Sequence, residues 1–292
     1  MPIKIRAARP ASFASIYLEL KALLTSGEPV KVGHGTGFFY RFKGNLFLIT
    51  NWHVVTGRNP DNDKLEIYPT PHLASFMLSS KSTPAHFLPM DDIHFYEDGK
   101  PAWLQLQNNG DGRIDIVAIP MSFDPEMHVV AINDFTDDTT KAFEPGREVV
   151  IVGYPFEKND NHPFPIWKKA MIASEPGYKT LQKWQCLLDA PGRPGMSGSP
   201  VFFMSEGAQL RRELGEIRAA GRALDFIRAF KPQDITDLAD GTYLLQFAGV
   251  YTGSYGDQSL DRLNLGRMLF SSLVDELMEK GEPGENPYAP QN

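Results

Sequence analysis

The sequence predicts a mainly β protein built from two antiparallel barrels, and two observations support this fold class. From Gly37 onward, apolar residues fall in short runs rich in β-branched and aromatic side chains, separated by turn signals. These runs form two groups, divided by a connecting stretch rich in Asp and Thr that ends before Gly146. We therefore expect the first barrel over residues 31–120 and the second over residues 144–256.

An amphipathic helix is expected ahead of the barrels. Apolar side chains recur there at helical spacing, which predicts a helix over Ala11–Thr25 that ends near Gly27. We therefore assign residues 1–30 to an N-terminal helical extension. The residues with this spacing are Phe13, Ile16, Tyr17, Leu20, Leu23 and Leu24.

The short apolar runs predict the strands of both barrels, and Lys43-Gly44-Asn45 predicts a hairpin turn between the first two. In the first barrel the predicted strands are Gly37–Phe42, Leu46–Asn51, Leu65–Tyr68, Ala102–Leu106 and Ile114–Ile119. In the second barrel they are Gly146–Pro155, Ala170–Ser174, Trp184–Asp189, Pro200–Met204 and Leu244–Tyr251.

Helical segments interrupt and follow the second barrel. Residues 205–240 are predicted as a helical insertion, because Leu210, Leu214 and Ile217 begin an apolar helical face. A final helix is expected near Leu265–Met278, followed by a tail rich in Pro, Gly and Asn that we expect to be disordered from about Gly281. Residues 264–292 are thus predicted as a C-terminal helix and tail.

Three segments carry side chains suited to nucleophilic catalysis. Ser197 stands between glycines in Gly195-Met196-Ser197-Gly198-Ser199-Pro200, just before a predicted strand. His53 follows the apolar run Leu46–Trp52, and Asp115 lies inside the run Ile114–Ile119. A serine hydroxyl is a weak nucleophile at neutral pH and needs a base such as histidine, whose ring a carboxylate orients. We therefore predict His53, Asp115 and Ser197 as a catalytic triad.

The order of these residues along the chain narrows the class of fold. The same chemistry occurs on unrelated folds in different orders, and the order His, Asp, Ser belongs to the chymotrypsin arrangement. Asp91, Asp92 and Asp111 are alternative acids in turn-like contexts, whereas Asp115 is predicted within an apolar strand.

The three segments resemble those of the trypsin-like serine peptidases, and most of all the bacterial, disulfide-free HtrA-type branch. The resemblance extends from Lys31 to Leu260 and implies two six-stranded antiparallel barrels, the chymotrypsin-like double barrel. It also implies a peptidase domain over residues 31–263. HtrA-type proteins usually carry a C-terminal PDZ domain, and the residues after Leu260 are too few to form one.

The resemblance also implies roles for residues around Ser197. The backbone N–H groups of Gly195 and Ser197 are expected to form the oxyanion hole. Pro191 stands six residues before Ser197, at the pocket position where trypsins place an acid. Met196 replaces the acid that pairs with the new N-terminus in animal trypsins, so activation by that route is not expected. The other expected substrate-binding residues, in Gly249–Gly253, are Tyr251, Thr252 and Gly253.

The function implied by the resemblance is a serine endopeptidase that hydrolyses polypeptide substrates through an acyl-enzyme. Because the insertion at residues 205–240 lies between two strands of the second barrel, it is the candidate contact for a regulatory protein partner. The competing interpretation is a latent enzyme or pseudoprotease that binds peptides or proteins without cleaving them. The presence of all three triad residues argues against that interpretation.

No metal site or cofactor is predicted. Asp61-Asn62-Asp63 lacks the Gly and Glu of a calcium loop. Cys186 is most simply a buried strand residue, and His34 is expected to have a structural role near a turn. The histidines without metal-ligand spacing are His72, His86, His94, His128 and His162.

Composition limits the remaining classes of function. The 292 residues are 42% hydrophobic, which suffices for a sizeable core, and the single cysteine excludes an internal disulfide. Lacking disulfides and a charged-then-apolar leader over Met1–Ala11, the protein is expected to be cytoplasmic. No apolar run approaches the roughly 18 residues that span a bilayer. The net charge of −7 disfavours nucleic acid. We therefore expect neither a membrane nor a nucleic-acid partner.

Overall fold

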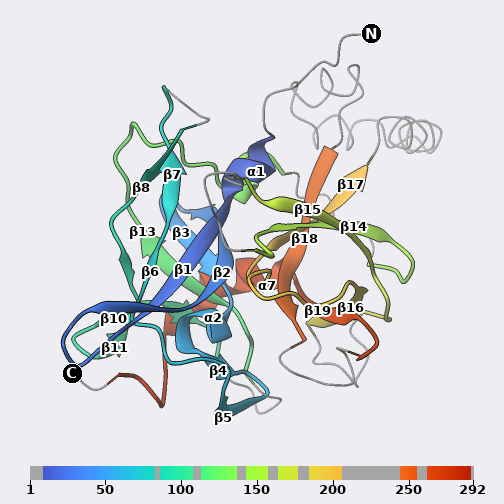
Figure 1. Ribbon diagram of the computed structural model, residues 1–292. Helices are drawn as coiled ribbons and strands as arrows, with labels where there is room; N and C mark the ends of the chain where they lie inside the picture. The colour runs from blue at the N-terminus through green and yellow to red at the C-terminus, as the bar shows by residue number, and fades with distance from the viewer. Residues whose placement is uncertain are drawn as a thin grey trace.

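The strands form two curled antiparallel sheets that lie side by side (Figure 1). The computed structural model describes residues 9–82, 86–107, 113–136, 143–156, 164–176, 184–205, 244–254 and 262–290. The first sheet has eight strands in the order β20-β12-β13-β3-β2-β1-β6-β9, and the second has six in the order β15-β14-β17-β18-β19-β16. The mainly β class with two barrel-like halves is therefore confirmed.

Each sheet is formed by strands from different parts of the sequence. The first sheet contains β1 (Ser15–Leu23), β2 (Pro29–Phe42), β3 (Asn45–Thr50), β6 (Leu73–Ser75), β9 (Ile93–His94), β12 (Leu104–Gln105), β13 (Val117–Met121) and β20 (Glu282–Pro283). The second contains β14 (Glu148–Gly153), β15 (Ile166–Met171), β16 (Gln185–Asp189), β17 (Pro200–Ser205), β18 (Leu244–Gly253) and β19 (Leu265–Phe270).

Short elements complete the first half and connect it to the second. The helices are α1 (Pro10–Ala14), α2 (Trp52–Thr56) and the 3-10 turn η1 (Ile132–Asp134). Three small hairpins pair β4 (Arg58–Asn59) with β5 (Asn62–Glu66), β7 (Met77–Ser79) with β8 (Phe87–Pro89), and β10 (Tyr96–Glu97) with β11 (Lys100–Pro101).

The expected N-terminal helix over Ala11–Thr25 is wrong for most of its length. Helix α1 ends at Ala14, and the next nine residues form β1, which pairs with β2 from Ser15↔Phe38 to Leu23↔Pro29. Ile16, Leu18 and Leu20 alternate along β1 and are buried in one hydrophobic cluster. Strand pairing on both edges of β1 outweighs the helical spacing, and the first sheet begins well before residue 31.

The C-terminal predictions also need correction. Leu265–Phe270 is strand β19, held between β18 and β16, so the helix is only α7 (Ser272–Lys280) and the second sheet continues past residue 256. The tail from Gly281 is ordered as far as residue 290, because β20 pairs with β12 of the first sheet. With β1 and β20 both outside the predicted barrel of residues 31–120, the first sheet has eight strands rather than six.

The predicted helical insertion at residues 205–240 lies almost wholly outside the described residues, which resume at Leu244. Among the parts of the chain that the structure describes, no helix is long and apolar enough to cross a membrane.

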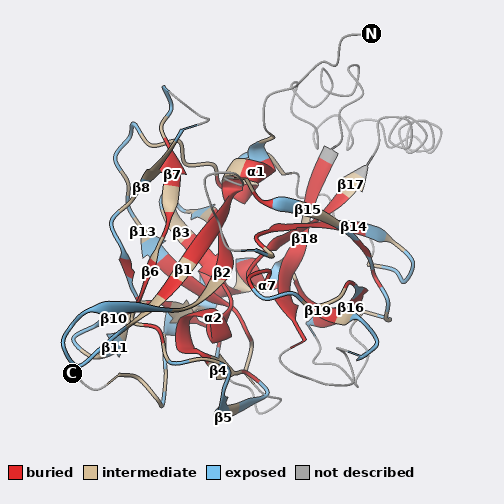
Figure 2. Cartoon of the chain, in the orientation of Figure 1, coloured by how far each residue is buried: buried red, intermediate tan, exposed pale blue. Residues whose placement is uncertain are grey.

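Three hydrophobic clusters hold the fold together, and Figure 2 shows the buried residues concentrated on β1, β2, β14 and β18. One cluster, which includes Trp52 and Phe39, packs inside the first curled sheet. Another, which includes Met196 and Tyr251, packs inside the second. The third cluster lies between the two sheets and includes residues of α7 such as Leu277. Apolar packing thus fixes the two sheets against each other, which positions the residues at their boundary.

Candidate active site

Helix α2 places His53 at the end of the first sheet. The helix begins just after β3 and ends at Gly57, whose φ is 72°. The Gly57 N–H donates a hydrogen bond of 2.9 Å to the His53 carbonyl oxygen. A side chain at Gly57 would lie 2.3 Å from the Tyr68 carbonyl oxygen, so only glycine fits. The Tyr68 hydroxyl donates to the His53 carbonyl at 2.8 Å. These contacts hold the His53 backbone, and its side chain is buried.

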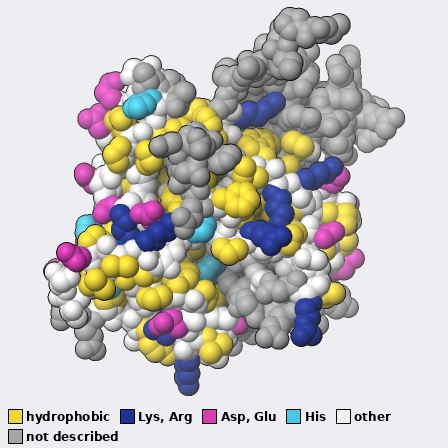
Figure 3. Space-filling model, in the orientation of Figure 1, with side chains coloured by type: hydrophobic (Ala, Val, Ile, Leu, Met, Phe, Trp, Pro, Cys, Tyr) yellow, Lys and Arg dark blue, Asp and Glu magenta, His cyan; other side chains and the backbone are white. Residues whose placement is uncertain are grey.

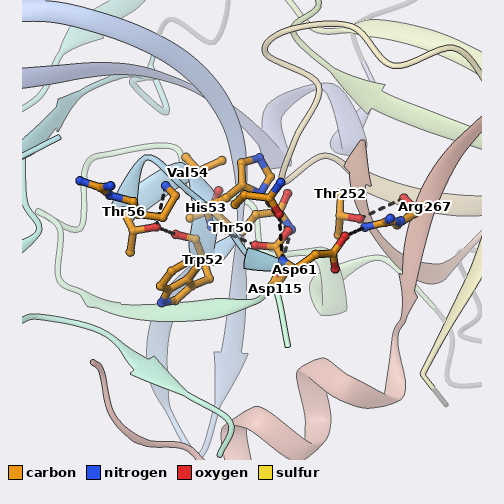
Figure 4. Close-up of polar contacts among 12 residues, drawn as sticks. Thr50, Trp52, His53, Val54, Thr56, Asp61, Asp115, Thr252 and Arg267 are labelled. Carbon is orange, nitrogen blue, oxygen red and sulfur yellow. Dashed lines mark hydrogen bonds and ion pairs between the residues drawn. The ribbon is translucent and has the colours of Figure 1, made fainter. Parts of the chain in front are cut away.

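Asp115 binds both the backbone and the ring of His53. Its Oδ1 accepts the His53 backbone N–H at 2.9 Å, and its Oδ2 lies 2.8 Å from His53 Nδ1 (Figure 4). Asn51 Nδ2 donates to the Asp115 carbonyl oxygen at 2.7 Å, which fixes the Asp115 backbone. The carboxylate therefore favours the tautomer with the proton on Nδ1, leaving Nε2 to act as a base.

The acid lies in a different local structure from the one predicted. Asp115 precedes β13, which begins at Val117, rather than lying within the strand. Of the alternative acids, Asp92 accepts a hydrogen bond from Ser75, far from His53, and Asp111 lies outside the described residues. Burial raises the pKa of Tyr68 well above its usual value, and the negative charge of Asp115 adds to this effect. Tyr68 therefore remains a hydrogen-bond donor.

The turn that carries Ser197 is tied to both sheets. Thr36 of β2 donates its N–H to the Ser197 carbonyl at 2.9 Å, and its hydroxyl donates to the Gly195 carbonyl at 2.7 Å. On the other side, the N–H of Gly198 donates to the Tyr251 carbonyl on β18 at 2.9 Å. The position of Ser197 therefore depends on the boundary between the two halves of the fold.

The glycines around Ser197 are required by close backbone contacts. Gly195 and Gly198 each have φ of 85°, a region that side chains disfavour. A side chain at Gly195 would lie 2.2 Å from the Tyr154 carbonyl oxygen, and one at Gly198 would lie 1.9 Å from the Thr36 carbonyl oxygen. The Gly-x-Ser-Gly pattern is thus a steric requirement of this turn.

The same turn presents two backbone donors. The Met196 N–H donates to the Arg193 carbonyl at 3.2 Å, and Pro194 followed by Gly195 with positive φ is typical of a type II turn. No oxygen of the described residues accepts a hydrogen bond from the N–H of Gly195 or Ser197. Both groups predicted for the oxyanion hole are therefore available to a ligand oxygen.

A cleft of about 920 Å³ brings the predicted residues together. His53 and Ser197 both line it, as does Gly195. Of the expected substrate-binding residues, Pro191, Thr252 and Gly253 line the cleft. Tyr251 does not; its side chain is only 1% exposed and points into the second sheet's cluster.

Several residues of the cleft were not predicted. His34, expected to be structural, lines the cleft and stacks on Tyr17, and its Nε2 lies 2.3 Å from where a Gly195 side chain would begin. The sequence indicates the position of His34 only through its neighbours: His34 comes just before Gly35 and Thr36, and Thr36 contacts the turn that carries Ser197. Arg193 and Glu66 also line the cleft, and Glu66 pairs with Arg58 at 3.0 Å. Their surface positions give no sequence signal.

The other predicted residues lie apart from the cleft. Cys186 is buried, and its burial raises the pKa of the thiol to about 12, which keeps it protonated. In the described ranges, no three His, Cys, Asp or Glu side chains gather as a metal site would require. Figure 3 shows Lys and Arg in several small groups on the face in view rather than in one continuous patch.

The family comparison agrees with the fold and the cleft. The family model for the trypsin-like peptidase domain matches residues 35–209, more than half of the chain. The chain therefore belongs to the trypsin-like peptidase family. The matched segment contains His53, Asp115 and Ser197. No curated protein compared with the chain matches it.

Proposed function

We propose that the protein is a serine endopeptidase in which His53, Asp115 and Ser197 form the catalytic triad. The observation that carries this proposal is the pair of contacts from the Asp115 carboxylate to His53, in a cleft that Ser197 also lines. The family match supports peptidase chemistry. The unengaged N–H groups of Gly195 and Ser197 support the oxyanion hole.

The proposed reaction has two stages, acylation of Ser197 and hydrolysis of the acyl ester. Ser197 Oγ attacks the carbonyl carbon of the scissile peptide bond, and its proton passes to His53 Nε2. The N–H groups of Gly195 and Ser197 stabilise the oxyanion. His53 then returns the proton to the leaving nitrogen as the C–N bond breaks, which leaves an acyl ester on Ser197. A water molecule gives its proton to His53 and attacks the ester, and the carboxylic acid product leaves as Ser197 recovers its proton.

The substrate is proposed to bind as an added strand along β18. Thr252, Gly253 and Ser254, at the end of β18, line the cleft next to the Ser197 turn. The pairing of β17 with β18 ends at Pro200↔Val250, and an extended peptide can add to a strand edge beyond such a point. Membership of the HtrA-type branch and regulation through residues 205–240 are further parts of this proposal. Deletion of that insertion should then change the rate of cleavage or its dependence on a partner.

The first test is labelling of the purified protein by a fluorophosphonate probe, which reacts with activated serines. We expect covalent labelling that is lost in both Ser197→Ala and His53→Ala. If a well-folded wild-type protein is not labelled, the endopeptidase proposal is wrong and the latent or binding-scaffold interpretation takes its place. Circular dichroism of the three proteins provides the control for folding.

A further inference from the structure

The cleft has two walls beside Ser197, and their inner ends meet. Residues 191–195 form one wall and residues 252–254 form the other, and both line the cleft. A peptide strand paired with residues 252–254, with its carbonyl carbon at Ser197, places the side chain before the scissile bond between these walls. The depth between the walls therefore limits which side chain fits, provided that the proposed endopeptidase function holds.

Tyr251 joins the two walls at their inner ends. It immediately precedes Thr252 on one side, and its hydroxyl donates to the carbonyl oxygen of Ala190, which immediately precedes Pro191 on the other, at 3.4 Å. Tyr251 is 1% exposed and Ala190 is fully buried. The ring thus lies beneath the space between the walls.

The Tyr251 ring is fixed in that place by its surroundings. Its backbone N–H donates to the Ser199 carbonyl at 2.9 Å and its carbonyl accepts from Gly198, so it cannot shift along the strand. The ring lies over Gly266 of β19, where an added side chain would come within 2.3 Å of the hydroxyl. Glycine at position 266 therefore leaves the room that the ring occupies.

The geometry points to Tyr251 as the residue that sets the primary specificity of the peptidase, by closing the inner end of the pocket from beneath, behind the residues that line the cleft. The enzyme then cleaves after small residues, such as Gly, Ala and Ser, and excludes large aromatic and long basic side chains. Charge agrees with this assignment: of the described residues that line the cleft, Glu66 is the acid, and Arg58 already pairs with it. Among the cleft-lining residues that the structure describes, a basic side chain thus meets no unpaired carboxylate.

The test compares covalent labelling of Ser197 by two peptidyl phosphonate diphenyl esters that differ only in the side chain at the reacting position, one alanine-like and one phenylalanine-like. We expect the wild type to react faster with the alanine-like probe by roughly tenfold or more. In Tyr251→Ala the ring is removed. The labelling rate with the phenylalanine-like probe should therefore rise, and the ratio of the two labelling rates should reverse. Tyr251→Phe keeps the ring and should keep the wild-type ratio.

Phe203→Ala provides a matched control for damage to the core. Phe203 lies in the same hydrophobic cluster as Tyr251, but its ring packs against Phe143 and Arg147 rather than beside Ala190, so its loss should leave the ratio of rates unchanged. If Tyr251→Ala fails to fold, the wild type and Tyr251→Val decide the question. Equal or faster reaction of the wild type with the phenylalanine-like probe overturns the inference and leaves the endopeptidase proposal intact. Absence of labelling by either probe and by the fluorophosphonate overturns both.

Discussion

Asp115 contacts His53 through both carboxylate oxygens, one at the backbone N–H and one at the ring Nδ1. The first contact, at 2.9 Å, sets where the histidine backbone lies, and the second, at 2.8 Å, sets which ring nitrogen carries the proton. Both side chains are almost fully buried, at 6% exposure for His53 and 5% for Asp115. Water therefore competes little with either contact.

Replacing Asp115 tests whether this pair orients the base. Asp115→Asn keeps the shape but removes the charge and favours the wrong tautomer of His53, so the rate of fluorophosphonate labelling should fall by roughly 10³–10⁴-fold. Asp92→Asn changes an acid that contacts Ser75 instead and should leave the rate unchanged. An Asp115→Asn protein that reacts at the wild-type rate would rule out the proposed role of Asp115 in orienting His53.

Met196 holds the Ser197 turn by apolar packing. Met196 is 1% exposed and packs within the hydrophobic cluster of the second sheet. Met196→Leu should cost less than about 1.5 kcal/mol of unfolding free energy and keep labelling near the wild-type rate. Met196→Asp would bury a carboxylate without a partner and should lower both stability and labelling. Urea unfolding and labelling kinetics, measured on the same samples, check both expectations.

Gly195 is tested by comparison with a second glycine of the same backbone conformation. Gly195 has φ of 85° and Gly44 has φ of 81°, but a side chain at Gly44 meets nothing within 4 Å. Gly44→Ala should therefore show only the cost of positive φ, about 1–2 kcal/mol. Gly195→Ala adds a clash with the Tyr154 carbonyl and should lower the labelling rate by roughly 10²-fold or more, because the turn must move. Equal labelling by the two variants would contradict this account of the turn.

Cys186 should be inert while the protein is folded. Burial raises the pKa of its thiol to about 12 from 9.0, so at pH 8 almost no thiolate is present and no reagent reaches it. The folded state thus binds a proton that the unfolded state releases, and this stability is lost as the pH rises from about 9 toward 12. We expect one thiol to react with Ellman's reagent only after unfolding, and Cys186→Ala to lose less stability than the wild type above pH 9. Rapid reaction of the native protein would show that the thiol is accessible.

Local sequence patterns predicted the fold class because the residues that form each strand and turn of this protein lie close together in the sequence. The run before His53 is strand β3 followed by a short helix, and the glycines near Ser197 mark a real steric constraint. The pattern failed at β1 because Ile16, Tyr17 and Leu20 fit helical spacing, while Ile16, Leu18 and Leu20 fit strand alternation equally well. Only the pairing with β2 decides between these.

Structural features that depend on contacts between residues far apart in the chain could not be predicted from local sequence patterns. The segment from Glu282 onward is held by partners far earlier in the chain: β20 pairs with β12, and Asn286 donates to the Tyr96 hydroxyl. Composition alone, which does not reveal these partners, favoured disorder. Similarly, the strand segment at Tyr251 was predicted beside the substrate, but the direction of its side chain follows from its register with β19. Spacing therefore identified residues that line the cleft better than it identified the direction of the Tyr251 side chain.

Strand β20 has a consequence for when the protein becomes active. It completes one edge of the first sheet, and just beyond it the Glu285 carbonyl accepts the indole N–H of Trp52, the neighbour of His53, at 3.3 Å. During translation the ribosome must therefore synthesise the whole second half before the first half can close. We expect the nascent chain to remain without a finished cleft around His53 until β20 has emerged from the ribosome.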